Sequence, residues 1–245
     1  MMKWSLDEIS KPAAWRSAAA ELLATGPFVF LGTGAVVASG VVTGDEMNAA
    51  RLAVIALAHG LAIMLLVAAT ANISGGHINP AVTIVMWFTG RITTGKAILY
   101  VAAQLIGAII GSLLLVTVVN SELEGGTLGA HALGPVVGSS AGSGFLVEII
   151  LTFALLFVIF AVAVHKTGLA AYAPAAIGLV VLVDIMVGLP MTGASMNPAR
   201  SLGPALVSGE WANHWIYWAG PIVGGLLGGL VYSYLFMSKQ ERKET

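Results

Sequence analysis

Two copies of the tripeptide Asn-Pro-Ala carry the clearest capacity for chemistry in this sequence. Asn is a favoured helix N-cap and Pro suits the first helical position, so each copy predicts the start of a helix. Backbone amides can hold the carboxamide oxygens, which leaves two NH₂ donors beside the positive ends of two helix dipoles. Such donors would bind a water oxygen and interrupt a proton-conducting chain of hydrogen bonds. The plainer alternative is a pair of caps at a packed junction. The residues are Asn79, Pro80, Ala81, Asn197, Pro198 and Ala199.

Arg200 follows the second copy directly, within a run of small and apolar residues. Its guanidinium combines five hydrogen-bond donors with a permanent positive charge. The donors can replace the hydrogen bonds of a passing water, while the charge repels protons and cations. A pair of helix caps alone does not explain this residue, so Arg200 favours a wet passage over a packed junction.

The composition sets the surroundings of these residues. The chain has 245 residues, of which 58% are hydrophobic and 9% charged, with a formal net charge of −1 and no cysteine. A soluble domain carries roughly 25% charged residues. The chain is therefore expected to reside in lipid, which disfavours a soluble enzyme, a nucleic-acid-binding protein and a disulfide-stabilised secreted domain.

Six apolar runs are long enough to cross a bilayer as helices. An even number of spans places both termini on one side, and nine basic residues on that side against one at an outer edge predict cytoplasmic termini. The sequence thus predicts an integral, multi-pass membrane protein. The expected spans are Ser17–Ser39, Leu52–Thr70, Lys96–Val119, Gly144–Val164, Tyr172–Leu189 and His214–Phe236.

The sequence also repeats itself at a fixed offset. Asn79 and Asn197 are 118 residues apart, and Gly60 recurs as Gly178 at the same offset. We expect one domain, 1–245, with repeat 1 at about 17–119 and repeat 2 at about 144–236. Three spans in each repeat make the second copy inverted, which places a site where the halves meet at the midplane. Asn79–Phe88 and Asn197–Val207 then predict two re-entrant half-helices. The fold class is an all-α membrane protein with six transmembrane helices, two half-helices and an inverted three-helix repeat.

The sequence resembles the aquaporin family over nearly its whole length. The matching segments are Ser74–Thr83, Asn197–Ser201 and His214–Pro221. The resemblance implies a passive water channel that excludes protons and ions, a homotetramer with one pore in each protomer, and no enzymatic activity. It implies no cofactor, no metal and no nucleic acid, with lipid, water and small neutral solutes as the other partners.

The resemblance also implies which residues form the narrowest point of the passage. Ile185 stands where strict water channels commonly have a second histidine, so the set resembles the tonoplast-intrinsic subgroup. A wider and less polar aperture is expected to pass ammonia, urea and hydrogen peroxide besides water. His131 is a possible extra filter residue, with a solvated loop histidine as the alternative. The four filter residues are His59, Ile185, Ala194 and Arg200.

Three acidic residues lie inside apolar runs, where an unpaired charge is costly. The resemblance implies that Glu21 and Glu148 accept hydrogen bonds from the backbone of the two re-entrant loops, with a proton relay as the alternative. Asp184 adjoins the filter position Ile185. It is expected either to cap the irregular end of its helix or to pair with a neighbour.

Other functions remain as alternatives. Inverted repeats are shared with secondary transporters, but no carboxylate cluster lies near either Asn-Pro-Ala. A mainly glycerol-conducting channel is disfavoured, because Ser201 and Ala205 replace the acidic and basic residues that such channels tend to carry. Ser195 and His59 form no activated triad for an intramembrane enzyme. The short tails and loops favour the cell membrane over the vacuolar membrane.

Overall fold

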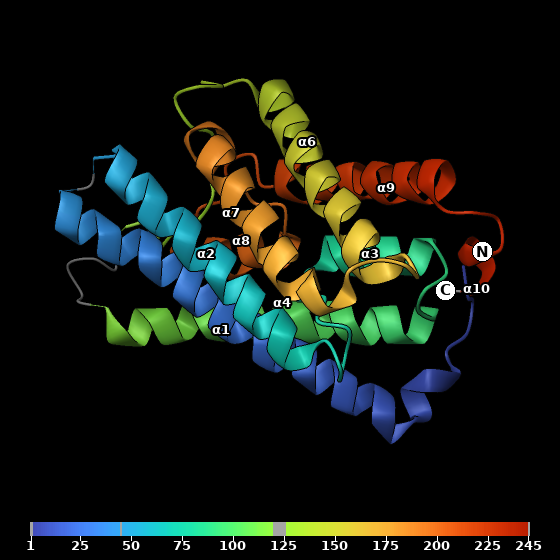
Figure 1. Cartoon of the computed structure of the whole chain (residues 1–245). Helices are drawn as coiled ribbons and strands as arrows, with labels where there is room; N and C mark the ends of the chain where they lie inside the picture. The colour runs from blue at the N-terminus through green and yellow to red at the C-terminus, as the bar shows by residue number, and fades with distance from the viewer. Residues whose placement is uncertain (1, 45, 120–125, 245) are drawn as a thin grey trace.

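The computed structural model describes residues 2–44, 46–119 and 126–244, and its regular elements are helices (Figure 1). Six of them are long and apolar enough to cross a membrane, and two further helices are about half as long. The expected fold class is therefore confirmed. The long helices are α1 (Pro12–Thr43), α2 (Ala49–Thr70), α4 (Thr94–Val118), α6 (Ala141–Ile159), α7 (Ala173–Thr192) and α9 (Ile216–Phe236).

The helix ends differ from the expected spans by up to five residues, most of all at α1. α1 begins at Pro12, because Pro fits the first turn, and ends where Gly44 adopts the left-handed conformation with φ 71°. α6 continues as a π-helical turn, Phe160–Val164, so the fourth span ends at Val164 as expected. α7 runs through Pro190 to Thr192, so the expected end at Leu189 is too early. Proline close to a helix end removes one bond without preventing the last turn.

The two half-length helices are α3 (Pro80–Phe88) and α8 (Pro198–Ser208). Asn79 caps α3 by accepting from the backbone N–H of Ala81, and Asn197 caps α8 by accepting from Ala199 and Arg200. At 1.5 Å per residue, nine and eleven residues reach about half of a bilayer core of about 30 Å. Figure 1 places both inside the bundle.

The long helices pack in pairs that the repeat relates. α1 packs mainly on α4, α6 mainly on α9, and α2 crosses α7. At that last crossing a Cβ on Gly60 would lie 2.7 Å from the carbonyl oxygen of Gly178, so glycine is needed on both helices. Glycines with the same function between α1 and α4 and between α6 and α9 are Gly107, Gly111, Gly220, Gly224 and Gly228.

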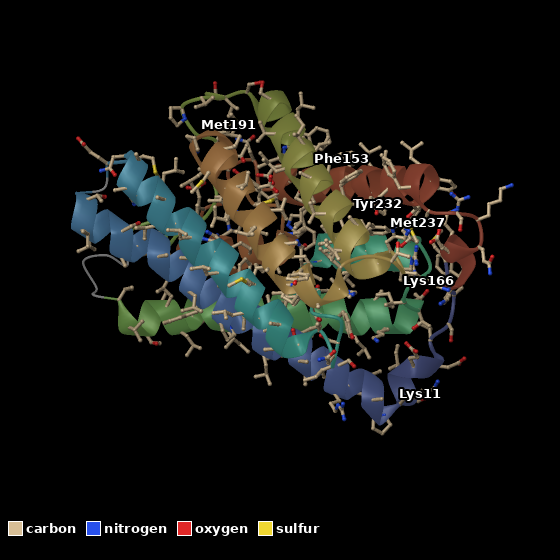
Figure 2. All side chains as sticks on the ribbon, in the orientation of Figure 1. Lys11, Phe153, Lys166, Met191, Tyr232 and Met237 are labelled. Carbon is tan, nitrogen blue, oxygen red and sulfur yellow. The ribbon has the colours of Figure 1, made fainter. Side chains whose placement is uncertain are left out.

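Both chain ends lie at one end of the bundle (Figure 1). There the N-terminal segment pairs with the α3–α4 connection, since the N–H of Thr94 donates to the carbonyl of Lys3 at 3.1 Å. His165, between α6 and α7, contacts Glu241 in the short C-terminal helix α10 (Glu241–Glu244) at 3.3 Å. Lys166 and Met237 lie at this end, whereas Met191 lies toward the other (Figure 2).

Candidate functional site

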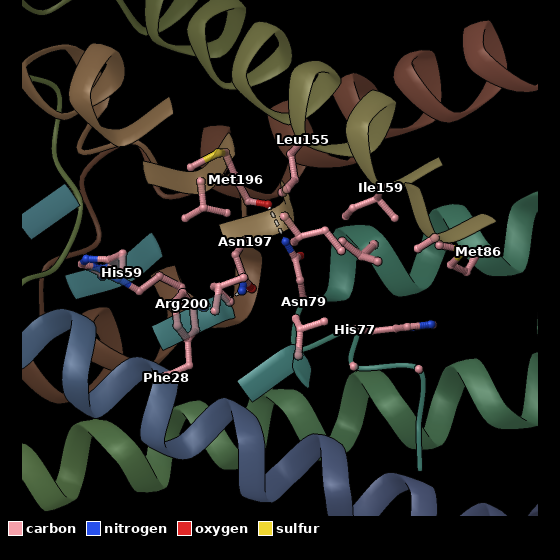
Figure 3. Close-up of a pocket in the computed structure, with 18 of the residues that line it drawn as sticks. Phe28, His59, His77, Asn79, Met86, Leu155, Ile159, Met196, Asn197 and Arg200 are labelled. Carbon is pink, nitrogen blue, oxygen red and sulfur yellow. Dashed lines mark hydrogen bonds between the residues drawn. The ribbon is translucent and has the colours of Figure 1, made fainter. Parts of the chain in front are cut away.

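A cavity of about 380 Å³ runs through the interior between the two halves (Figure 3). His59, Arg200 and Phe28 line one end, and His77 and Met86 line the other. Asn79 and Asn197 line it between these ends, where α3 and α8 meet. The residues that the sequence placed at the centre and at the filter therefore share one cavity. Pro80, Ala81, Pro198 and Ala199 are buried in the first turns of the half-helices.

The two asparagines hold the opposite halves together. The Nδ2 of Asn79 donates to the carbonyl of Met196 at 2.8 Å, and the Nδ2 of Asn197 donates to the carbonyl of Ile78 at 3.0 Å. The side-chain oxygen of each asparagine accepts a hydrogen bond from a backbone N–H in the first turn of its own half-helix. A carboxamide nitrogen carries two hydrogens, so one donor on each asparagine is left for a guest in the cavity.

The residue before each asparagine has a strained backbone. Ile78 has φ 56° and Met196 has φ 53°, a left-handed conformation that costs a non-glycine residue about 1–3 kcal/mol. This conformation is held because the backbone N–H and C=O of each of these two residues are both hydrogen-bonded. Their carbonyls accept from the opposite asparagine, and their N–H groups donate to Glu21 at 2.6 Å and to Glu148 at 2.9 Å.

Glu21 and Glu148 are fully buried, and each accepts from two consecutive backbone N–H groups of a re-entrant loop. Each also has a side-chain donor that our sequence reasoning missed. The amide of Gln104 donates to Glu21 at 2.8 Å, and the hydroxyl of Thr192 donates to Glu148 at 2.6 Å. Gln104 is a polar residue within an apolar span, which was the available signal.

Arg200 is 3% exposed and is held by two acceptors. Its Nε donates to Nε2 of His59 at 3.1 Å, and its Nη1 donates to the carbonyl of Gly129 at 2.8 Å. The Nδ1 of His59 lies 2.9 Å from the carbonyl of Ile55, which defines a neutral imidazole protonated at Nδ1. Both ring nitrogens are thus occupied. The imidazole of His59 therefore holds the guanidinium of Arg200 in place and has no ring nitrogen left for a guest.

Two apolar residues complete the predicted filter. Ile185 on α7 and Ala194 in the loop before α8 line the cavity and are 3% exposed each. A Cβ on Gly188 would lie 2.9 Å from the Cβ of Ala194, so the helix passes close behind this loop. Neither side chain offers a hydrogen bond, so Arg200 supplies the donors at this level.

His131 lies in the connection between α4 and α6 and is 6% exposed. Its Nδ1 is 2.8 Å from the hydroxyl of Ser201, and its ring packs 5.1 Å from that of Tyr217. The ring is not among the residues that line the cavity. Burial and the positive charge of Arg200 hold the pKa of His131 well below its ordinary value. His131 is therefore a neutral residue packed behind Arg200, and the solvated alternative is wrong.

Asp184 is 6% exposed, and its Oδ2 is buried without a hydrogen-bond partner within the described part of the chain. It neither caps the end of α7 nor pairs with a neighbouring cation there. The structure gives no account of why a carboxyl group stands at this position.

Six spans, two half-helices meeting at their capped ends and a mainly apolar cavity that carries polar groups at its centre and filter define a membrane channel. A family model described as major intrinsic protein matches residues 8–232, and the chain belongs to this family.

Several relatives are similar over nearly the whole chain. "Aquaporin TIP4-4" of Zea mays is 46% identical, with 95% of this chain and 91% of that protein covered. "Aquaporin-4" of Mus musculus is 44% identical, with 94% and 70% covered. Among solved structures, the aquaglyceroporin of Plasmodium falciparum has a TM-score of 0.79 at 23% identity, over 95% of this chain and 100% of that one. This last likeness concerns the fold alone.

Proposed function

We propose that this chain is a passive channel for water and for small neutral solutes such as ammonia, urea and hydrogen peroxide, and that it excludes protons and ions. The observation that carries the proposal is the single cavity that contacts Arg200, Asn79 and Asn197 in turn. Water crossing the molecule by this route meets fixed donors and a fixed positive charge, with no covalent step.

Proton exclusion follows from the centre of the cavity. One free hydrogen on each of Asn79 and Asn197 points to a guest oxygen, and the N-terminal dipole ends of α3 and α8 face the same place. A water molecule that accepts both bonds directs its own hydrogens away from the centre. The chain of hydrogen bonds then runs in opposite senses on the two sides, which prevents proton transfer along it. Arg200 adds an electrostatic barrier at the filter.

The solute range rests on the filter. Ile185 and Ala194 present apolar surface, and Arg200 presents the hydrogen-bond donors. A small neutral solute has few hydrogen bonds to water and needs few replacements when it passes this filter. We propose that His131 acts by packing behind Arg200 through Ser201, not as an additional lining residue. Ser201 is buried and bonded to Ser195 at 2.6 Å, with no acidic group at this position, which disfavours a mainly glycerol-conducting channel.

A secondary transporter is the alternative from another class. Such a protein needs an ion-coupling site near the substrate. Glu21 and Glu148 are bonded to loop backbone, and no acidic side chain among the described residues lines the cavity. A passive route is therefore the better supported function.

Osmotic shrinkage of proteoliposomes tests the proposal. A sucrose step should give a water flux that is nearly insensitive to temperature, and gradients of urea or ammonium should give flux without proton leak. Empty liposomes are the control. A flux that saturates or needs an ion gradient would establish the transporter alternative, and a dominant glycerol flux would establish the polyol channel.

Replacing Ile185 by His tests the filter. The imidazole adds bulk and polarity at the filter, so we expect urea and ammonia permeability to fall while water permeability is kept. Val183→His is the matched control, since Val183 lies on the same helix but is 55% exposed. If the Ile185→His protein passes urea as the original does, Ile185 does not form the filter.

We further propose that both termini face the cytoplasm of a cell-membrane protein, with repeat 1 at about 17–119 and repeat 2 at about 144–236 as the two halves of one pore. The chain has no cysteine, so single cysteines can report sidedness. In intact cells a membrane-impermeant maleimide should label Glu46→Cys and leave Ser238→Cys unlabelled. The reverse pattern would invert the orientation, and recovery of the protein in a vacuolar fraction would overturn the location.

A further inference from the structure

A second cavity, of about 630 Å³, opens at the end of the bundle that carries both termini. It lies between the C-terminal end of α3 and the last turns of α9, and the tail after α9 forms its outer wall. Phe88 from α3 and Tyr234 from α9 line it together with three cationic side chains, Arg91, Lys239 and Arg242. We call it the basic groove.

The wall of the basic groove holds hydrogen-bond donors that have no acceptor. Nε and Nη1 of Arg91 and the hydroxyl of Ser233 are buried without a partner within the described part of the chain. Ser233 is 5% exposed. The other contacts of Arg91 are weak ones: its Nη2 lies 3.9 Å from the sulfur of Met237, and its Cζ lies 5.9 Å from the ring centroid of Phe160. Burial also lowers the pKa of the Arg91 guanidinium. Arg91 is half-buried and also lines the channel cavity, and no acidic side chain lines the groove beside it. An anionic guest would therefore offset part of the cost of holding this charge.

The outer wall adds positive charge. Nη1 of Arg242 donates to the carbonyls of Ser233 at 3.0 Å and Met237 at 3.2 Å, which folds the tail back onto the end of α9. Lys239 is exposed beside it. No acidic side chain among the described residues lines the groove. Glu241 in the same tail accepts from the backbone N–H of Ser238 at 2.7 Å and lies 3.3 Å from His165. The lining residues described for the groove therefore carry three cationic side chains and no acidic one.

The position of the groove selects its occupant. Tyr234, Leu235 and Phe236, in the last turn of α9, are 68%, 71% and 55% exposed, so an apolar surface suited to acyl chains ends where the basic residues begin. A bare phosphate ion would leave most of a 630 Å³ cavity unfilled. We propose that the basic groove binds the phosphoryl headgroup of an anionic phospholipid from the leaflet on the side of the termini. Basic pockets beside transmembrane helices recognise such headgroups.

In this site the roles of the residues differ. Lys239 and Arg242 attract the headgroup from the membrane surface, while Ser233 and Arg91 supply donors to phosphate oxygens deeper in the groove. The acyl chains extend along the exposed face of α9. Lipid binding in the basic groove goes beyond the proposed channel function. It is measured separately from water flux, so the lipid site can be disproved while the channel function stands, and the reverse.

Native mass spectrometry of the detergent-solubilised full chain tests this site with defined probes. Dioleoylphosphatidylglycerol is the anionic lipid, dioleoylphosphatidylcholine the zwitterionic control, and inorganic phosphate and glycerol phosphate the soluble controls. We expect selective retention of phosphatidylglycerol. Lys239→Gln should weaken it about fivefold, and Lys239→Gln with Arg242→Gln further still. The matched control, Lys11→Gln with Arg16→Gln, removes the same charges from exposed positions in and beside α1 and should retain the lipid as the original does.

The remaining outcomes overturn the proposal. Equal retention of phosphatidylcholine would remove the selectivity, and equal loss in the Lys11 and Arg16 control would reduce it to general surface charge. Competition by inorganic phosphate at matched concentration would make the site one for soluble phosphate. Ser233→Ala keeps the charges and the tail contacts, so unchanged affinity there and in Lys239→Gln would show that the lipid binds elsewhere.

Discussion

At the scale of single residues, the guanidinium of Arg200 is fixed before any guest arrives. His59 and Gly129 hold two of its nitrogens, and these bonds leave Nη2 as the donor with no protein partner within the described chain. The family resemblance predicted that Arg200 and His59 lie at one level of the passage. It did not reveal their direct bond, because that bond depends on the tautomer that the carbonyl of Ile55 imposes on His59.

Arg200→Val should relax selectivity. The change removes both the charge and the donors while the cavity widens, so we expect urea flux to rise about tenfold, which corresponds to about 1.4 kcal/mol of barrier. Proton leak should appear with it. Stopped-flow light scattering and a pH-sensitive dye in proteoliposomes measure the two fluxes, and Arg16→Val, at an exposed position, is the control. Unchanged selectivity would remove Arg200 from the filter.

His131 gives the protein a pH-dependent stability. Its pKa in the folded chain is well below the ordinary 6.5, so below that pH the unfolded chain takes up a proton that the folded chain does not. Stability is therefore lost as pH falls, at up to about 1.4 kcal/mol per pH unit for this one group. Tm in detergent should fall between about pH 7.5 and pH 5.5, and it should fall less in His131→Asn. Parallel curves for the two proteins would contradict this assignment.

At the scale of elements, the half-helices were predictable and the loops before them were not. Asn, Pro and the short apolar runs located α3 and α8 to within a residue at each end. No sequence signal marks Ile78 or Met196 as left-handed, since both are residue types that avoid this conformation. The conformation exists because a buried carboxylate and the opposite asparagine bond the same peptide, and those contacts are formed only in the tertiary structure.

Glu148→Gln tests how the second loop is held. The carboxylate accepts three hydrogen bonds, and an amide in its place directs a donor at one of the N–H groups of Ser195 and Met196. A loss of about 1–3 kcal/mol is expected, with a Tm lower by about 2–4 °C for each kcal/mol and with reduced water permeability. Glu46→Gln, at an exposed position, is the control. A protein with unchanged Tm and flux would show that the loop does not depend on this carboxylate.

At the scale of the whole molecule, hydropathy and the repeat predicted the helix content and the pairing of halves. Lipid surrounds the bundle, so each span must be apolar and must satisfy its backbone hydrogen bonds within its own helix. Long apolar runs in the sequence therefore locate the spans directly. The helix ends were less certain, because Pro190 permits a last turn and Gly44 allows α1 to continue to Thr43. The basic groove was not predicted, since Arg91 and Arg242 are far apart in the sequence.

The family resemblance predicts that four copies assemble. The outward faces of the bundle are apolar, as Leu65, Val183 and Leu146 show with 64%, 55% and 56% exposure, so either lipid or another copy must cover them. Light scattering with correction for bound detergent should give about four times the 25.1 kDa protomer mass. A protomer mass with full water flux would show that each chain works alone.

The bonds between Asn79 and Met196 and between Asn197 and Ile78 also bear on how the chain is made. Translation at about 5–20 residues per second delivers Asn197 roughly 6–24 s after Asn79, because 118 residues separate them. Throughout this interval the carbonyl of Ile78 and the amide of Asn79 have no counterpart and would be stranded in hydrocarbon. We therefore expect the first half-helix to complete its insertion only after the second half has been made, so that this segment does not follow the order of synthesis.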